Sequence, residues 1–182
     1  GINQCKIPLT TAMIFDYHKE LSNAQKLVDE QNDYDPICSP YSVPNDFWGP
    51  DYSHSSAEYV SLDLQAYYDI EDIILHDGGG LAGNVKVQKA DSPNGPWMTI
   101  IDYDAVKFND WVTFNEPVAG LVRYLRFEAS GDDNVATGEV FICGEENTNF
   151  TPDIKPGKGK NGALYDLSCE DAGLVWEHPF DT

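Results

Sequence analysis

The sequence predicts an all-β domain, a sandwich or barrel of about eight strands. Short runs rich in β-branched and aromatic residues recur along the 182-residue chain, and turn residues separate them. Helical signals are few, and the clearest stretch, residues 19–30, offers one or two helical turns. Strands that alternated with longer helices would have indicated a parallel α/β sheet instead.

The strands carry two kinds of signal. Residues 57–64 (AEYVSLDL) alternate strictly, which places Val60, Leu62 and Leu64 on one face and polar side chains on the other. Residues 69–77 (DIEDIILHD) form an apolar run of the kind found in buried strands. The expected strands cover residues 11–17, 57–64, 69–77, 84–90, 97–103, 110–115, 121–129 and 138–143.

The composition changes at the end of this strand-rich part, residues 1–144. Residues 145–163 are polar and contain Pro and Gly, as expected of a linker or of a tail on the surface. Residues 164–182 regain apolar side chains, including Trp176 and Phe180. The sequence therefore predicts a C-terminal extension over 145–182, which either packs back on the sandwich or begins another domain.

The charge is strongly acidic and excludes some partners. Eleven Lys and Arg residues stand against 31 Asp and Glu, which gives a net charge of −20. Nucleic-acid backbones and anionic membranes both require clustered basic residues, so neither is an expected partner. No apolar run approaches the ~20 residues of a membrane span, so no membrane insertion is expected. Calcium, neutral ligands and simple solubility all remain compatible with this charge.

The cysteines indicate the compartment. Cys5, Cys38, Cys143 and Cys169 are widely spaced and form no CxxC pair, which argues against a zinc or redox site. An even number at long spacing suits two disulfides in an oxidising, extracellular or cell-surface environment. Four buried thiols are the alternative. No signal peptide precedes Gly1, as expected for a mature form or for a piece of a longer chain.

Several motifs occur in an order that resembles a known family. They are AQKLVD (24–29), DFW (46–48), AEYVSLDL (57–64), IEDIILHD (70–77), SPNGPW (92–97) and VRYLRFEASGDDNVATGEVFICG (122–144). Together they resemble the discoidin family, which has the galactose-binding-like fold. This family includes coagulation factor C-type domains and carbohydrate-binding modules of secreted bacterial glycosidases and lyases. The resemblance covers residues 10–144 and implies a jelly-roll β-sandwich.

The chain departs from the family pattern at three positions. Glu30 stands where the family has the glycine of a VDG turn, Asp46 replaces the threonine of T-x-W, and Gln65 replaces the glycine of DLG. These departures concern the ligand more than the fold.

The resemblance implies a structural calcium ion near the loop that follows residue 29. Asp29 stands at the family aspartate, Asp46 at the threonine, and Glu139 at the carboxylate of the last strand, with Asp33 as a further candidate. Calcium takes six to eight oxygen ligands, and such a hard oxygen site favours calcium over zinc or copper. In the alternative interpretation Asp29 caps a turn and Asp33 is solvated.

The resemblance also places the ligand loops at one end of the sandwich, over residues 32–56, 76–84 and 130–137. Aromatic faces stack under sugar rings, and short polar side chains hold the hydroxyl groups. The candidate ligand-binding residues are Tyr34, Tyr41, Tyr52, His54, His76, Asp77, Asp132 and Asn134. The two histidines could instead be structural, and Trp48 is expected in the core. Few basic residues lie nearby, which suits a neutral or weakly basic sugar.

The factor-type branch of the family ties its entry to its exit strand with a disulfide. Cys5 and Cys143 occupy those places here, and Cys38–Cys169 would then tie the extension to the first loop. Four cysteines allow three connectivities.

The sequence contains no nucleophile elbow, zinc-protease motif or phosphate loop, so we do not expect an enzyme. The expected function is that of a calcium-stabilised, lectin-like carbohydrate-binding module of a secreted or cell-surface protein, next to other domains. The alternative is an extracellular protein–protein interaction module whose loops hold a polypeptide.

Overall fold

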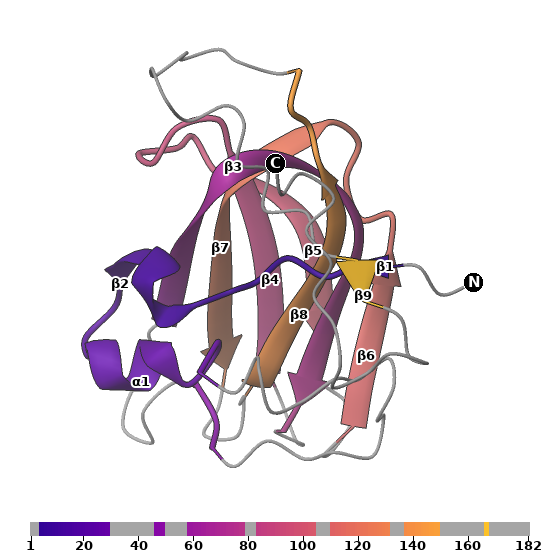
Figure 1. The fold of residues 1–182 in the computed structure, drawn as a ribbon. Helices are drawn as coiled ribbons and strands as arrows, with labels where there is room; N and C mark the ends of the chain where they lie inside the picture. The colour runs from indigo at the N-terminus through magenta and orange to yellow at the C-terminus, as the bar shows by residue number, and fades with distance from the viewer. Residues whose placement is uncertain are drawn as a thin grey trace.

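The computed structural model describes residues 4–29, 46–49, 58–78, 83–104, 110–131, 137–149 and 166–167. Within these residues the fold is a mostly antiparallel β-sandwich with little helix (Figure 1). The elements are β1 (Gln4–Cys5), η1 (Thr11–Met13), β2 (Ile14–Tyr17), α1 (Leu21–Gln25), β3 (Glu58–Asp77), β4 (Gly83–Ala90), β5 (Met98–Asp104), β6 (Asp110–Asn115), β7 (Leu121–Gly131), β8 (Thr137–Glu146) and β9 (Asp166–Leu167). The prediction of an all-β jelly-roll sandwich is confirmed.

The long strand β3 belongs to both layers of the sandwich. Its first part pairs with β2 and β7, in the larger sheet of order β2-β3-β7-β4-β5. Its second part pairs with β6 and β8 and forms the smaller sheet with them. Figure 1 shows β3 curving over one end of the molecule between these two parts. Both ends of β3 therefore lie at the other end.

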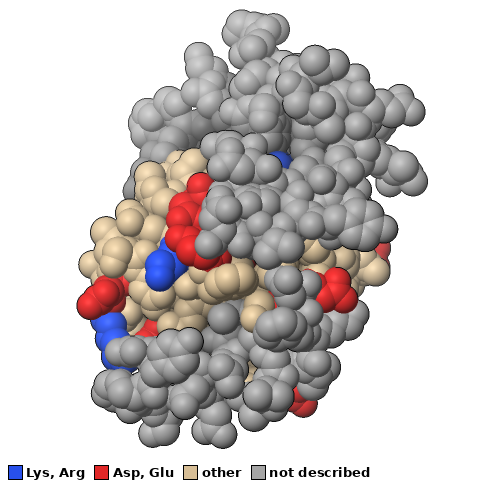
Figure 2. Space-filling model, turned by 90° about the horizontal axis from the view of Figure 1, so that it is seen from below, with Lys and Arg blue, Asp and Glu red and all other residues tan. Residues whose placement is uncertain are grey.

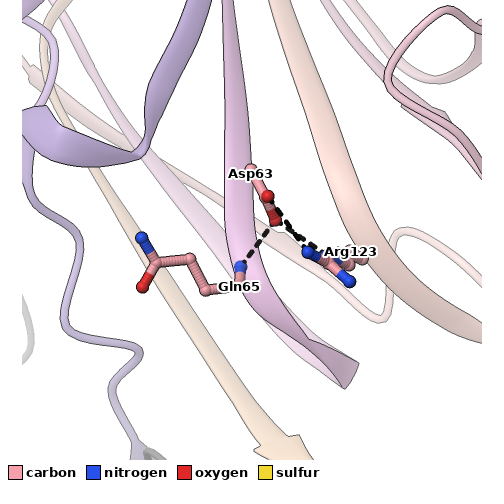
Figure 3. A network of polar contacts seen from close by, with 3 residues as sticks. All are labelled: Asp63, Gln65 and Arg123. Atoms are coloured by element: carbon pink, nitrogen blue, oxygen red, sulfur yellow. Dashed lines mark hydrogen bonds and ion pairs between the residues drawn. The ribbon is translucent and has the colours of Figure 1, made fainter. Parts of the chain in front are cut away.

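A shift in register makes this curve possible. The pairing of β3 with β7 shifts between Asp63 and Tyr68, and Gln65 within this interval has a φ of 67°. The backbone N–H of Gln65 donates to Asp63 Oδ1 at 2.7 Å (Figure 3). The two strands predicted over 57–64 and 69–77 form one continuous strand, because an irregularity of this kind bends a strand without ending it.

The core lies between the two layers. Val60, Leu62 and Leu64 of the larger sheet are at most 1% exposed, as the alternation predicts. Ile73 and Ile142, which pair across the smaller sheet, complete the opposite wall. Trp48 is 1% exposed, so its expected place in the core is confirmed.

The one or two helical turns predicted within residues 19–30 are present. α1 covers Leu21–Gln25, and turns follow as far as Asp29. The N-cap residue Glu20 makes no capping hydrogen bond from its side chain, and Lys19 before it has a φ of 61°. Leu27 and Val28 are nonetheless buried, so packing and not helix propensity fixes this segment.

Two charged pairs lie on the outer face of the larger sheet. Arg123 donates from Nε and Nη2 to the two carboxylate oxygens of Asp63 at 2.9 and 3.2 Å (Figure 3). The hydrogen bond to Asp63 raises the pKa of Arg123, although burial opposes the shift. Arg126 donates to Asp16 and to Ser61 Oγ. Both arginines of β7 therefore pair with a carboxylate.

The C-terminal extension contributes a strand to the described structure. β9 pairs antiparallel with β1, and Lys6, directly after β1, forms an isolated bridge with Cys143 of β8. Strands of two residues carry no periodic signal, so the sequence did not predict them. β8 extends two residues into the predicted linker 145–163, as far as Glu146, and residues 147–149 are described after it.

Candidate functional site at one end of the sandwich

Most of the predicted ligand segments adjoin one end of the sandwich. Asp77 at the end of β3 pairs with Thr137, the first residue of β8, and Asp110, the first residue of β6. Glu58 at the start of β3 pairs with Ala129 near the end of β7. The described residues that flank the predicted loops 32–56, 76–84 and 130–137 therefore meet at this end.

Three segments that are separate in sequence lie next to one another at the place where calcium was predicted. Trp48 and Thr137 exchange backbone hydrogen bonds of 2.9 and 2.7 Å, and the N–H of Val140 donates to the carbonyl of Leu27 at 3.1 Å. These contacts bring residues 27–29, 46–48 and 137–140 together.

The predicted metal ligands differ in their environments. Glu139 is fully buried, and its Oε1 accepts the N–H of Val140. Asp46 Oδ1 is buried and has no hydrogen-bond partner within the described residues. Asp29 is exposed. Among described His, Cys, Asp and Glu side chains, no group of three or more is placed to hold a metal ion. Any calcium bound here would therefore need other oxygens, such as backbone carbonyls.

A row of aromatic rings leads from this end along the outer face of the smaller sheet. The His76 ring centroid lies 5.8 Å from that of Phe47 and 4.9 Å from that of Trp111, and the Trp111 ring lies 5.6 Å from Phe141. His76 is 1% exposed. This burial among rings favours the structural role for His76 that the sequence left open.

Asp77 is a buried carboxylate held by a tyrosine. The Tyr103 hydroxyl on β5 donates to Asp77 Oδ2 at 2.8 Å, and Asp77 is 4% exposed. The ring of Tyr103 in turn packs edge-on against Phe114. Asp77 thus lies at the end of the sandwich where the ligand loops are predicted, but its side chain is buried beneath the surface.

A second group of buried polar contacts at this end, around Glu58, was not predicted from the sequence. Glu58 is 1% exposed; it pairs with Lys19 at 3.3 Å and accepts a hydrogen bond from Asn23 Nδ2 at 3.1 Å. Asn23 Nδ2 also donates to the carbonyl of Gly49 at 3.0 Å. The alternation of β3 contained a signal for it, because Glu58 falls on the same inward face as Val60. A carboxylate at an inward position needs partners.

Several predicted residues lie outside the described residues. They are Asp33, Tyr34, Tyr41, Tyr52, His54, Asp132, Asn134, Cys38 and Cys169. Cys143 is buried, and the backbone of Cys5 lies one residue before the Lys6–Cys143 bridge, whereas the side chain of Cys5 is not described. The two disulfides remain predictions.

No family model and no curated protein matches the sequence. Solved structures do share its fold. One is the CBM32-6 module of a family 89 glycoside hydrolase produced by Clostridium perfringens, with a TM-score of 0.51 and 18% identity over 74% of this chain and 98% of that one. The fold is that of the family 32 carbohydrate-binding modules.

Two further modules of this kind were solved with a sugar. The family 32 module of C. perfringens NanJ, in complex with galactose, has a TM-score of 0.54 and 11% identity over 77% of this chain and 98% of that one. The CBM32 of AlyQ, in complex with 4,5-unsaturated mannuronic acid, has a TM-score of 0.51 and 14% identity over 71% of this chain and 97% of that one. AlyQ also contains an alginate lyase domain, so such modules occur in enzymes. These likenesses confirm the fold that the resemblance implied.

Proposed function

We propose that this chain is a non-catalytic carbohydrate-binding module that holds a glycan with the loops at the end of the sandwich defined above. The observation that carries the proposal is the convergence at this end of Trp48, Asp77, Thr137 and the flanks of all three predicted ligand segments. Buried hydrogen bonds to Asp77 and Glu58 stabilise this end of the sandwich. A rigid frame that presents variable loops is a common way to build a binding site.

The charge favours a neutral sugar over an acidic one. Figure 2 views this end and shows Asp and Glu side chains at its surface, beside fewer Lys and Arg side chains. The net charge of the chain is −20. Galactose, which the NanJ module binds, is neutral, whereas the mannuronic acid bound by the AlyQ module carries a carboxylate. Repulsion between like charges supports a ligand of the neutral class.

A structural calcium ion is part of the proposal. The buried, unpartnered Oδ1 of Asp46 and the buried carboxylate of Glu139 lie on segments that backbone hydrogen bonds bring together. A divalent cation would offset their charge, and carbonyl oxygens of residues 27–29 would complete the shell with Asp29. EDTA should lower the Tm of the chain, and Asp46→Asn should remove that response. An equal Tm with and without calcium would exclude the ion.

Secretion and attachment to a larger enzyme or adhesin complete the proposal. Within the described residues no helix is long and apolar enough to cross a membrane. Shallow sugar sites bind weakly one at a time, so attachment to further domains or copies would raise avidity.

A glycan and polysaccharide array, run with the folded chain in calcium, tests the proposal. Binding to neutral glycans is expected, and Ala at one or more of Tyr34, Tyr41 and Tyr52 should reduce it at least tenfold without changing Tm, because stacking supplies much of the affinity. Tyr124→Ala, on the outer face of the larger sheet, is the matched control and should bind as the parent does. No binding by the folded chain on a broad array would favour the polypeptide-binding alternative.

A further inference from the structure

A tripeptide close after the end of β8 matches the acceptor motif for N-linked glycans. Residues 149–151 read Asn-Phe-Thr, and no other Asn-x-Ser or Asn-x-Thr occurs in the chain. The motif requires a middle residue other than proline and a hydroxyl two residues after the asparagine, and both conditions are met. Phe150 and Thr151 lie outside the described residues and contribute to the motif by their identity alone. Whether the motif can be used depends on the accessibility of Asn149.

Asn149 lies at the surface in a hydrogen-bonded turn. Residues 148 and 149 form this turn after the last residue of β8, Glu146, and both are exposed. The N–H of Asn147 donates to the carbonyl of Tyr67 at 2.9 Å, and Asn147 Oδ1 accepts the N–H of Asn149 at 3.0 Å. Asn147 therefore connects the turn to β3, while the side-chain amide of Asn149 makes no hydrogen bond to the described residues.

The turn lies at the end of the sandwich opposite the predicted ligand loops. β8 begins at Thr137, which pairs with Asp77 at the ligand end, and its last residue, Glu146, pairs with Tyr68 beside the curve of β3 (Figure 1). A strand of ten residues spans about 30 Å, at about 3.4 Å per residue. A bulky group on Asn149 would therefore stand a full strand length from Asp77 and leave the ligand end open.

We propose that Asn149 is the acceptor of an N-linked oligosaccharide. The donor class is an oligosaccharide joined to a lipid through pyrophosphate. Nδ2 of Asn149 forms a bond to the anomeric carbon, and the bond from that carbon to the pyrophosphate oxygen breaks. The lipid pyrophosphate leaves with the bonding electron pair, and the amide nitrogen loses one proton. The exposed turn provides the room that such a bulky, solubilising group needs. The proposal rests on the secretion proposed above, but not on sugar binding by the loops.

Secretion of the full chain from a eukaryotic host that glycosylates its secreted proteins tests the proposal. Intact mass is measured before and after an amidase removes N-linked glycans. Most molecules should carry the mass of one oligosaccharide, and the amidase should remove it. Thr151→Ala and Asn149→Gln should each abolish the added mass, whereas Thr151→Ser, which keeps the hydroxyl, should retain it. Asn94→Gln is the matched control, because Asn94 also lies in an exposed turn but is followed by Gly-Pro, and this variant should be modified as the parent is.

The masses decide the outcome without any sugar ligand. Modification of half or fewer of the secreted molecules would overturn the proposal, and so would added mass that persists in Thr151→Ala. If the Thr151→Ala chain is not secreted, treating the parent with the amidase in heavy-oxygen water labels the modified asparagine. A label at any position other than 149 would then overturn the assignment. A silent glycan array would contradict the proposed function and leave these masses unchanged, so the two proposals fail separately.

Discussion

The two sheets share one strand, β3, and their outer faces carry opposite kinds of side chain. In the larger sheet the outward residues Tyr59, Ser61 and Asp63 are aromatic or polar, and arginines from β7 lie over them. In the smaller sheet the outward residues Ile74 and His76 are buried with rings from β6 and β8. The first half of β3 alternates between apolar inward residues and polar or aromatic outward residues, whereas Ile73–Asp77 in the second half are buried on both faces.

This difference separates two properties that are easily confused. Alternation determines which side chains share a face. Whether that face meets water depends on what the rest of the chain places over it. On the larger sheet Arg126 lies over the outward residues. Its guanidinium lies 4.3 Å from the ring centroids of both Tyr59 and Trp97, and it donates to the fully buried Ser61. On the smaller sheet Lys6 lies over the Phe141 ring, and Trp111 packs against the buried cluster of Ile74 and Phe141.

The largest expected effect comes from comparing the loss of a phenylalanine on each of the two outer faces. Phe141→Ala should lower the free energy of unfolding by about 3–5 kcal/mol, because it leaves a cavity in a buried cluster. Phe15→Ala should cost less than about 1 kcal/mol, because Phe15 is 38% exposed and touches Tyr124 edge-on. Urea denaturation measures both, and equal costs would show that the two faces are equally solvated.

A glycine lies where the backbones of β8 and β3 are close to each other. A Cβ on Gly144 would lie 2.6 Å from the carbonyl oxygen of Asp69, which is backbone and cannot turn aside. Gly144→Ala should therefore cost about 1–3 kcal/mol in unfolding free energy. The control is Glu145→Ala at the next, exposed position, which should stay within about 0.5 kcal/mol. A tolerated alanine at 144 would mean that β8 can move away from β3.

The stability that Arg126 contributes to the larger sheet should depend on the shape of its side chain as well as on its charge. Arg126→Lys keeps the charge but loses the planar stack and the 2.8 Å hydrogen bond to Ser61 Oγ, so unfolding should cost about 1–2 kcal/mol less. Part of that loss comes from the buried Ser61 hydroxyl, which no longer accepts the hydrogen bond from Arg126. The same substitution made together with Ser61→Ala should cost less than Arg126→Lys alone, and additive costs would show that the hydroxyl finds another partner.

The smallest expected effect concerns a carboxylate at the rim of the smaller sheet's outer face. Burial, together with repulsion from Glu116, raises the pKa of Asp72, which pairs with Cys143 in the ladder. The folded state then binds this proton more tightly than the unfolded state. The contribution of Asp72 to stability therefore falls as pH rises from its unfolded pKa, near 3.8, through its raised folded value.

Asp72→Asn should remove this dependence. The Tm of the variant, relative to that of the parent, should be higher at pH 7 than at pH 4. In a Glu116→Gln background the difference between the two pH values should shrink, because one of its two causes is gone. A constant Tm difference across this range would show that the carboxyl group titrates alike in both states.

The sequence predicted the sandwich and the position of its core well, because alternation in β3 and β4 depends only on local spacing. It divided β3 into two strands, since nothing local distinguishes a bend from a loop over residues 64–68. β1 and β9 are too short to show a period. At the end where the ligand loops are predicted, Trp48 was placed correctly in the core. The contacts of the buried His76 with Phe47 and Trp111 could not be predicted, because these residues are distant in sequence.

The buried polar contacts of Glu58 and Asp77 also could not be predicted in full from local sequence. Glu58 at an inward position could have been noticed, but its partners Lys19 and Asn23 are defined only by the folded chain. The Tyr103–Asp77 contact joins β5 to β3 and has no local signature. Residue types in a sequence indicate which chemistry is available, and topology decides which of these residues meet.

The continuous β3 also has a mechanical consequence. Since its backbone is hydrogen-bonded in both layers, neither sheet can slide past the other or peel away without breaking part of the same strand's ladder. Under a pulling force, or during spontaneous opening, the two sheets should yield together as one unit instead of in succession. A module built in this way resists shear between its layers without needing a covalent link between them.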